Sequence, residues 1–282
     1  MQLLLNTIML EVNRWTSDHL ITHPLIDLLA PLKNAGFAAL EIWQYHISSL
    51  TPTEVDALAH KLQSLDMQTV ALGAYPLFHL DGADADTMSA TLDHLIDCAA
   101  VLGVSTFKIF PGRVASADAD APIRALSVDR LKDLAARLAQ HHMTLTMETH
   151  GGTLCDTLES TQQLLEELSG IANIGLCFQP YTEHDTDQAI ATYDTLHPHI
   201  SHIHLQNRNQ TDRSATLLQD GDWTDYTRFL SHIKKNGFDG LLCLEFTEGL
   251  FPPEGEEFTP QTVVDNAIKD REFVLQVWHE NN

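Results

Sequence analysis

The chain has 282 residues, of which 44% are hydrophobic and 20% charged, so it can bury a large core and is neither disordered nor of low complexity. Its 16 Lys and Arg residues against 39 Asp and Glu residues give a formal net charge of −23. Because nucleic acids are polyanions, this charge disfavours a nucleic-acid partner.

The N-terminal segment is predicted to be a strand and not a targeting signal. It lacks a basic stretch, its apolar run is interrupted at Asn6, and the run ends at Glu11. No part of the chain approaches the ~18 apolar residues that a membrane helix needs, so we expect no membrane partner. The four cysteines are far apart and form no C-x-x-C motif, which predicts reduced thiols and a cytoplasmic location.

Short β-rich runs alternate with amphipathic helical runs along the whole chain. Eight strands are predicted, beginning near Leu3, Phe37, Gln68, Ser105, Met143, Asn173, Ile200 and Gly240. Thr51-Pro52-Thr53-Glu54 is typical of a capped helix start, and Asp156 with Glu159 repeats the capping pattern. Thr259-Pro260 opens the last helix, after a predicted long loop from Glu248.

This strict alternation predicts parallel strands joined by right-handed crossovers. Eight such units close most readily into a (β/α)₈ TIM barrel, and no composition shift marks a second domain, so we predict one α/β domain over residues 1–282. An open doubly wound sheet is the alternative. It usually carries a glycine-rich phosphate-binding turn after its first strand, and no such motif occurs here.

Strand side chains alternate between two faces, and one face of a barrel strand points at the barrel axis. On the last four strands the apolar residues occupy the helix-facing positions. The inward positions are Thr144, Thr146, Glu148, Gly175, Cys177, Gln179, His202, His204, Cys243 and Glu245. The carboxyl ends of these strands therefore place Glu148, Gln179, His204 and Glu245 at matching height.

Two carboxylates that converge in a partly desolvated site repel each other unless a cation lies between them. One imidazole with three oxygen ligands suits Mn²⁺, Mg²⁺ or Co²⁺ better than a closed thiolate site, and Zn²⁺ is the remaining alternative. We therefore predict a divalent metal ion at Glu148, Gln179, His204 and Glu245.

Four segments carry a resemblance to a known family: METH (147–150), GLCFQP (175–180), HIHLQ (202–206) and CLEF (243–246). The chain resembles the xylose isomerase-like TIM-barrel superfamily of sugar isomerases and epimerases, and the resemblance extends over essentially the whole chain. It implies a metal-ligand set of Glu, Asp, His and Glu, which carries over to Glu148, His204 and Glu245. Gln179 stands where most relatives have Asp. This departure predicts weaker metal binding, and a barrel that has lost its metal is the alternative.

The resemblance also implies a chemistry. A metal-dependent isomerase or epimerase of this kind acts on a small polyhydroxy carbonyl compound through a cis-enediolate, with Glu148 and Glu245 as the acid and base pair. We expect Gln179→Asp to tighten metal binding, because a carboxylate adds charge attraction to the cation.

Other side chains at the predicted strand ends are candidate substrate contacts: Glu41, Trp43, His46, Lys108, His150 and Arg208. Lys108 and Arg208 could bind a carboxylate or another anionic group, and Trp43 could supply an apolar wall. A structural role is the alternative for each of them.

Three other functions remain open. A lyase of the same superfamily would dehydrate an inosose or a dehydroshikimate-like acid with the same metal. An apurinic-site endonuclease is disfavoured by the net charge. A degenerate, non-catalytic sugar-binding barrel is the third alternative, and pairing into a homo-oligomer is undecided.

Overall fold

The computed structural model describes residues 1–251, 255 and 257–280; the rest of the predicted loop after the last strand lies outside the described residues. Within this part of the chain, eight parallel strands close into a barrel in the order β1-β10-β7-β6-β5-β4-β3-β2. The strands are β1 (Gln2–Asn6), β2 (Ala39–Trp43), β3 (Gln68–Ala74), β4 (Thr106–Ile109), β5 (Thr144–Glu148), β6 (Ile174–Phe178), β7 (Ile200–Leu205) and β10 (Leu241–Leu244). The closed barrel confirms the predicted fold and excludes the open sheet.

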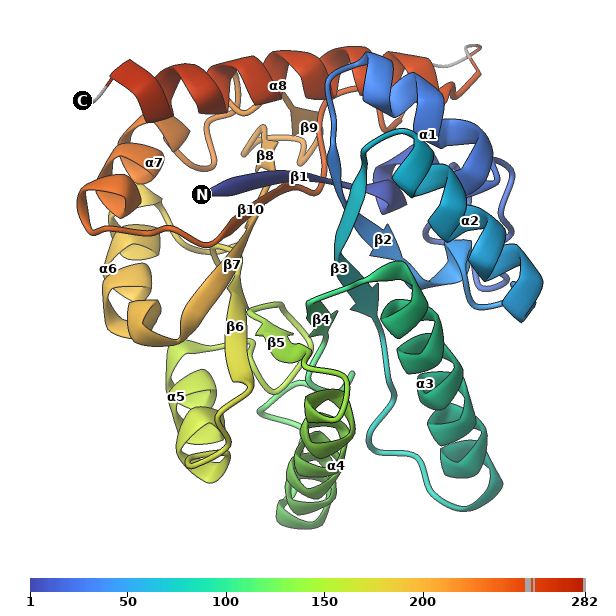
Figure 1. The fold of residues 1–282 in the computed structure, drawn as a ribbon. Coiled ribbons are helices and arrows are strands. Elements are labelled where there is room, and N and C mark those ends of the chain that lie inside the picture. The colour runs from blue at the N-terminus through green and yellow to red at the C-terminus, as the bar shows by residue number, and fades with distance from the viewer. Residues whose placement is uncertain (252–254, 256, 281–282) are drawn as a thin grey trace.

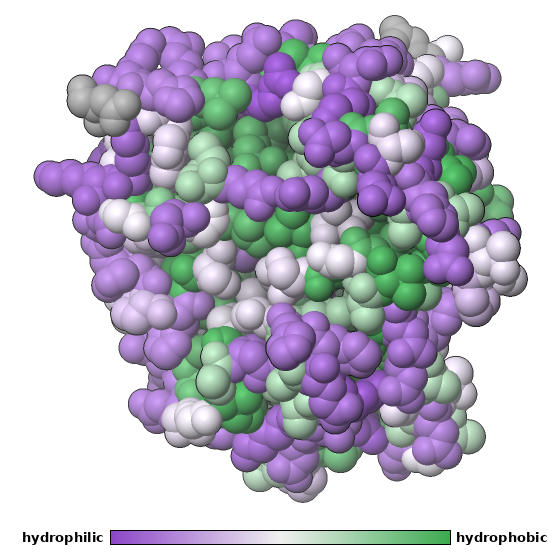
Figure 2. Space-filling view, in the orientation of Figure 1, coloured by the Kyte–Doolittle hydropathy of each residue, from purple (hydrophilic) through white to green (hydrophobic). Residues whose placement is uncertain are grey.

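Eight α-helices of the described chain surround the barrel, as the view in Figure 1 shows. They are α1 (Leu25–Asn34), α2 (Pro52–Ser64), α3 (Gly82–Leu102), α4 (Ala121–Ala139), α5 (Leu158–Glu167), α6 (Thr186–Leu196), α7 (Tyr226–Lys235) and α8 (Pro260–Glu280). The loop after β7 contains a short antiparallel hairpin of β8 (Asn207–Arg208) and β9 (Ala215–Thr216). Figure 2 shows hydrophilic residues over most of the outer helices in this view and apolar residues gathered toward the middle.

Helix starts follow the local rules of capping. Thr51 and Glu54 form the predicted capping box, in which the Thr51 N–H donates to Glu54 Oε2 at 2.8 Å. The predicted cap at Asp156 was wrong by one residue, because Thr157 accepts from the Ser160 N–H at 3.1 Å and caps α5. The Asp156 carboxylate instead accepts from the N–H of Ser116, which lies in the loop between β4 and α4.

The large apolar core lies between the strands and the helices, and a separate small cluster of Leu4, Ala39, Val70, Ala71 and Cys243 lies apart from it. Parallel register places Cys243 level with Leu4 on one side and with His204 on the other. Buried polar and charged residues, including Glu41, Lys108 and Glu148, accompany this cluster on the strands. The candidate site is built from these charged side chains.

Asp270 on α8 is buried and ties two loops to the barrel. Its Oδ1 accepts from the Leu218 N–H at 2.7 Å, and its Oδ2 accepts from the Thr247 hydroxyl at 2.6 Å. Burial raises the pKa of this carboxyl to about 6, although both hydrogen bonds act to lower it. The folded chain therefore holds the Asp270 proton to a higher pH than the unfolded chain does.

We expect Asp270 to make folding less favourable as the pH rises from about 4 to about 6, by up to about 3 kcal/mol, and to have a constant effect above that range. Asp270→Asn should remove this pH dependence, whereas Asp265→Asn, an exposed change on the same helix, should retain it. Urea unfolding from pH 4 to pH 8 measures the difference. If the free energy of unfolding depends on pH equally in the wild type and in Asp270→Asn, Asp270 does not have the raised pKa.

Candidate metal centre in the barrel

Three of the predicted ligands lie together at the carboxyl ends of their strands. Glu148 ends β5, His204 lies in β7, and Glu245 follows β10 directly. His204 Nδ1 is 3.4 Å from Glu148 Oε1 and 3.3 Å from Glu245 Oε1. Glu148 and His204 are completely buried, and Glu245 is 5% exposed.

The facing atoms of this group lack hydrogen bonds. Neither Glu148 Oε1 nor His204 Nδ1 has a hydrogen-bond partner among the described residues. Unpaired buried polar atoms are rare because they lose their interactions with water. Two carboxylates and one imidazole that meet in this way form a donor set that fits a divalent cation.

Gln179 is joined to this group through a residue that the sequence analysis did not single out. Gln206 Nε2 donates to Gln179 Oε1 and to Glu245 Oε2, both at 2.8 Å. Arg208 fixes the orientation of the Gln206 amide, because its guanidinium donates to Gln206 Oε1 at 2.7 Å. Position 206 continues the inward alternation of His202 and His204, and this pattern could have identified it.

Lys108 lies inside the barrel. Its Nζ is 2.7 Å from Glu148 Oε2 and 3.8 Å from Glu41 Oε1, and all three side chains are completely buried. Gly73 leaves room for the Lys108 and Glu41 side chains, since a Cβ at this position would lie 3.0 Å from Glu41 Oε1 and 3.2 Å from Lys108 Cε.

The ion pair sets the charge state of Glu148. Burial raises the pKa of Glu148, but the Lys108 ammonium and the His204 imidazole outweigh burial and hold the pKa below its usual range. Burial lowers the pKa of Lys108, but Glu148 outweighs it and raises this pKa above the usual value. Glu148 therefore stays ionised and accepts a proton poorly.

Glu41 lies beneath the group and has no exposed surface. Its Oε2 is 3.0 Å from His204 Nε2, and its Oε1 accepts from Asn6 Nδ2 at 3.1 Å. When the ring proton is on Nε2, the His204 N–H donates a hydrogen bond to Glu41 Oε2. The lone pair on Nδ1 is then available to a cation. This arrangement places Glu41 behind His204 and away from the position predicted for a substrate contact.

A cavity of about 220 Å³ lies next to Glu245. Its lining includes two of the predicted substrate contacts, Trp43 and His150, together with Tyr75 and Arg113, which the sequence analysis did not identify. His150 stacks on Phe110 with ring centroids 4.3 Å apart.

The remaining predicted contacts do not line this cavity. His46 is buried, with Nδ1 3.0 Å from Thr7 Oγ1 and Nε2 3.5 Å from Glu11 Oε1. Arg208 lies over the Trp223 ring at 5.6 Å and contacts Gln206. Trp43 and His150 therefore line the cavity. Glu41, Lys108 and Arg208 contact the buried group or Gln206, whereas His46 contacts neither and packs against Thr7 and Glu11.

Among the described helices, none combines the length and the apolar character that crossing a bilayer requires. This finding agrees with the absence of a long apolar run in the sequence.

Comparisons with known proteins identify similar barrels. A family model for the xylose isomerase-like TIM barrel matches residues 29–263. A 3-dehydroshikimate dehydratase from Bacillus anthracis is 29% identical over 181 residues, which span 63% of this chain and 64% of that relative. The crystal structure of the probable 3-DHS dehydratase from the same organism has a TM-score of 0.74 at 20% identity, covering 96% of this chain and 99% of that one.

Two further structures share the fold at lower identity. A D-tagatose 3-epimerase-like protein has a TM-score of 0.72 at 17% identity, covering 100% of this chain and 98% of that one. A xylose isomerase-like TIM-barrel protein from Mycobacterium smegmatis, in complex with magnesium, has a TM-score of 0.70 at 14% identity, covering 99% and 97%.

Proposed function

Because the chain belongs to the xylose isomerase-like TIM-barrel family, we propose that it is a divalent-metal-dependent dehydratase. In this proposal its substrate is a small, cyclic polyhydroxy carbonyl acid. The enzyme removes a proton from the carbon next to the carbonyl group and releases the neighbouring hydroxyl group as water.

The observation that carries this proposal is the unequal placement of the two glutamates. Glu245 lines the cavity, whereas Glu148 is completely buried and paired with Lys108. An epimerase needs two groups that exchange protons with carbon, but a dehydratase needs one base for the C–H bond and one acid for the leaving hydroxyl. We assign Glu245 as the base and His150, which lines the same cavity, as the acid.

Glu148, His204 and Glu245 would hold the metal ion, and Gln179 would be the fourth ligand. A divalent cation held there would polarise the substrate carbonyl and stabilise the negative charge that develops on its oxygen. The Gln206 amide holds Gln179 and Glu245 in place, and Lys108 keeps Glu148 ionised for cation binding.

The cavity supports a cyclic, anionic substrate. Trp43, Tyr75 and Phe110 present aromatic surface to it, and rings of this kind pack well against the faces of six-membered rings. Arg113 supplies a guanidinium in the same lining, and guanidinium groups bind carboxylates with two parallel hydrogen bonds. The dehydratase relative is named for an acid of this class.

A sugar isomerase or epimerase is the second candidate, because Glu148 and Glu245 both approach His204 Nδ1, at 3.4 Å and 3.3 Å, so two carboxylates face the same site. Incubation with 3-dehydroshikimate and with ketoses in deuterated water separates the two. A new ultraviolet-absorbing product with loss of water supports the dehydratase. Deuterium in recovered ketose supports the second candidate. If the metal-loaded protein gives neither the new product nor deuterated ketose, both candidate functions are contradicted.

The role of Gln179 is tested most closely by a change to Glu, which keeps the side-chain length and the Gln206 contact. We expect Gln179→Glu to tighten Mn²⁺ binding by about tenfold or more, because a carboxylate adds charge attraction. Isothermal titration calorimetry measures the affinity. Equal or weaker binding would show that Gln179 is not a metal ligand, and Gln210→Glu, on an outer loop, serves as the control.

A further inference from the structure

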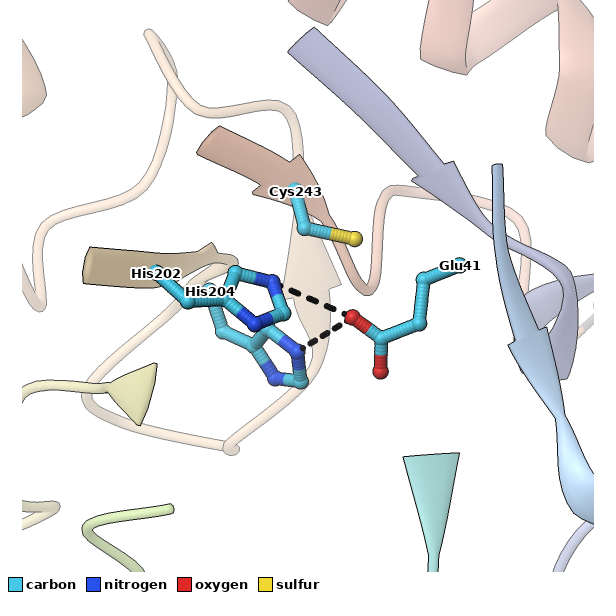
Figure 3. A group of neighbouring side chains, drawn as sticks. All are labelled: Glu41, His202, His204 and Cys243. Atoms are coloured by element: carbon cyan, nitrogen blue, oxygen red, sulfur yellow. Dashed lines mark hydrogen bonds and ion pairs between the residues drawn. The ribbon is translucent and has the colours of Figure 1, made fainter. Parts of the chain in front are cut away.

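A second group of potential ligands lies inside the barrel and shares only His204 with the candidate metal centre. This core cluster consists of Glu41, His202, His204 and Cys243, all completely buried. One ligand atom from each lies within 4.8 Å of the others. Figure 3 shows the Cys243 thiol and both imidazoles directed toward the Glu41 carboxylate.

Strand register brings these residues together. Cys243 on β10 is the direct partner of His204 on β7, and His202 lies two residues earlier on the same face. Glu41 projects from β2, and its Oε2 lies 3.0 Å from His204 Nε2 and 3.1 Å from His202 Nε2. The cluster is therefore built from three strands of the rigid barrel and from no loop.

The missing hydrogen bonds of the buried His202 ring point to a ligand. Neither of its ring nitrogens makes a well-oriented hydrogen bond within the described structure, although the side chain has no exposed surface. Cys243 Sγ donates only a long hydrogen bond among the described residues, to the Leu244 carbonyl oxygen at 3.9 Å. A buried imidazole that contacts Glu41 but forms no hydrogen bond is costly, and a cation would give both His202 Nε2 and the Cys243 thiol a ligand interaction.

The donor set differs in kind from that of the candidate metal centre. It contains one thiolate, two imidazoles and one carboxylate, which is the mixture that tetrahedral Zn²⁺ sites use. Coordinated thiols lose their proton, so Cys243 and Glu41 together would balance the two positive charges of the ion. The candidate metal centre, in contrast, has oxygen ligands and one imidazole, and this donor set suits harder cations.

We propose that the core cluster is a second metal site, selective for a thiophilic divalent cation such as Zn²⁺, with Glu41, His202, His204 and Cys243 as its ligands. The site goes beyond the proposed function and does not depend on it.

Sharing His204 couples the two sites. An ion bound at Nε2 leaves the ring proton on Nδ1, where Glu148 Oε1 and Glu245 Oε1 lie 3.4 Å and 3.3 Å away. A protonated Nδ1 cannot ligate a second ion, so a thiophilic cation in the core should weaken Mn²⁺ binding at the candidate centre.

Co²⁺ titration of the metal-free protein tests the site, because thiolate ligation produces a charge-transfer band in the near ultraviolet. We expect this band in the wild type, its loss in Cys243→Ser, and its retention in Cys98→Ser, a buried thiol on α3 far from the cluster in the fold. Glu245→Gln should keep the band, which separates this site from the candidate centre. Mn²⁺ should produce no such band.

Two results would overturn the proposal. One is the absence of the band in folded wild-type protein. The other is its retention in Cys243→Ser with loss in Cys177→Ser, since Cys177 also lies beside His202. If Cys243→Ser does not fold, His202→Gln provides the second variant, in which the band should require a much higher Co²⁺ concentration.

Discussion

The Glu245→Gln variant is expected to lose about 10²- to 10⁴-fold of kcat/KM, the range attributed to one general base. Glu245 is the carboxylate that lines the cavity, and an amide at this position cannot accept the substrate proton. The Gln carbonyl can still accept the hydrogen bond from Gln206 Nε2, so the local structure should persist. Steady-state kinetics with the substrate identified in deuterated water measures the loss.

The matched control is Glu248→Gln, the same chemical change on an exposed side chain three residues later. It should retain wild-type kinetics. If Glu245→Gln turns over substrate at the wild-type rate, Glu245 is not the base and the proposed division of roles between the two glutamates is wrong.

The second large effect is on stability. Lys108→Met is expected to destabilise the metal-free protein by about 3–5 kcal/mol, because it leaves the Glu148 charge buried without its partner. A divalent metal ion should recover part of this loss, since the released carboxylate attracts the cation more strongly. Urea unfolding with and without Mn²⁺ measures both effects.

Two comparisons make this result specific. Lys132→Met removes an exposed lysine from α4 and should change stability little. The double variant with Lys108→Met and Glu148→Gln removes both charges and should recover much of the stability lost in the single variant. A Lys108→Met protein as stable as the wild type would show that the buried ion pair does not form in solution.

The barrel and the inward face of each strand could be predicted because both follow from local periodicity. Each predicted strand start lies within two residues of the observed one, the largest difference being Phe37 against Ala39. Alternation along β5, β7 and β10 identifies Glu148, His204 and Glu245 as inward-facing residues, and the structure brings them together. Capping rules place helix starts to within one residue, as at Thr157.

The contacts across the barrel could not be predicted in this way. Lys108 is level with Thr146 in the register, and only the length of its side chain carries the ammonium to Glu148. The partner of Glu41 depends on which strands face each other after closure, and alternation within one strand carries no information about that. Both residues were therefore expected at the mouth, and they lie within the buried charge network.

We propose that Glu148, His204 and Glu245 hold a divalent metal ion. This proposal can be tested with an anomalous difference map from crystals soaked in Mn²⁺. We expect a peak within coordination distance of Glu148 Oε1, His204 Nδ1 and Glu245 Oε1. A map without a peak among these three atoms, from crystals in which Mn²⁺ has bound elsewhere on the protein, would contradict it.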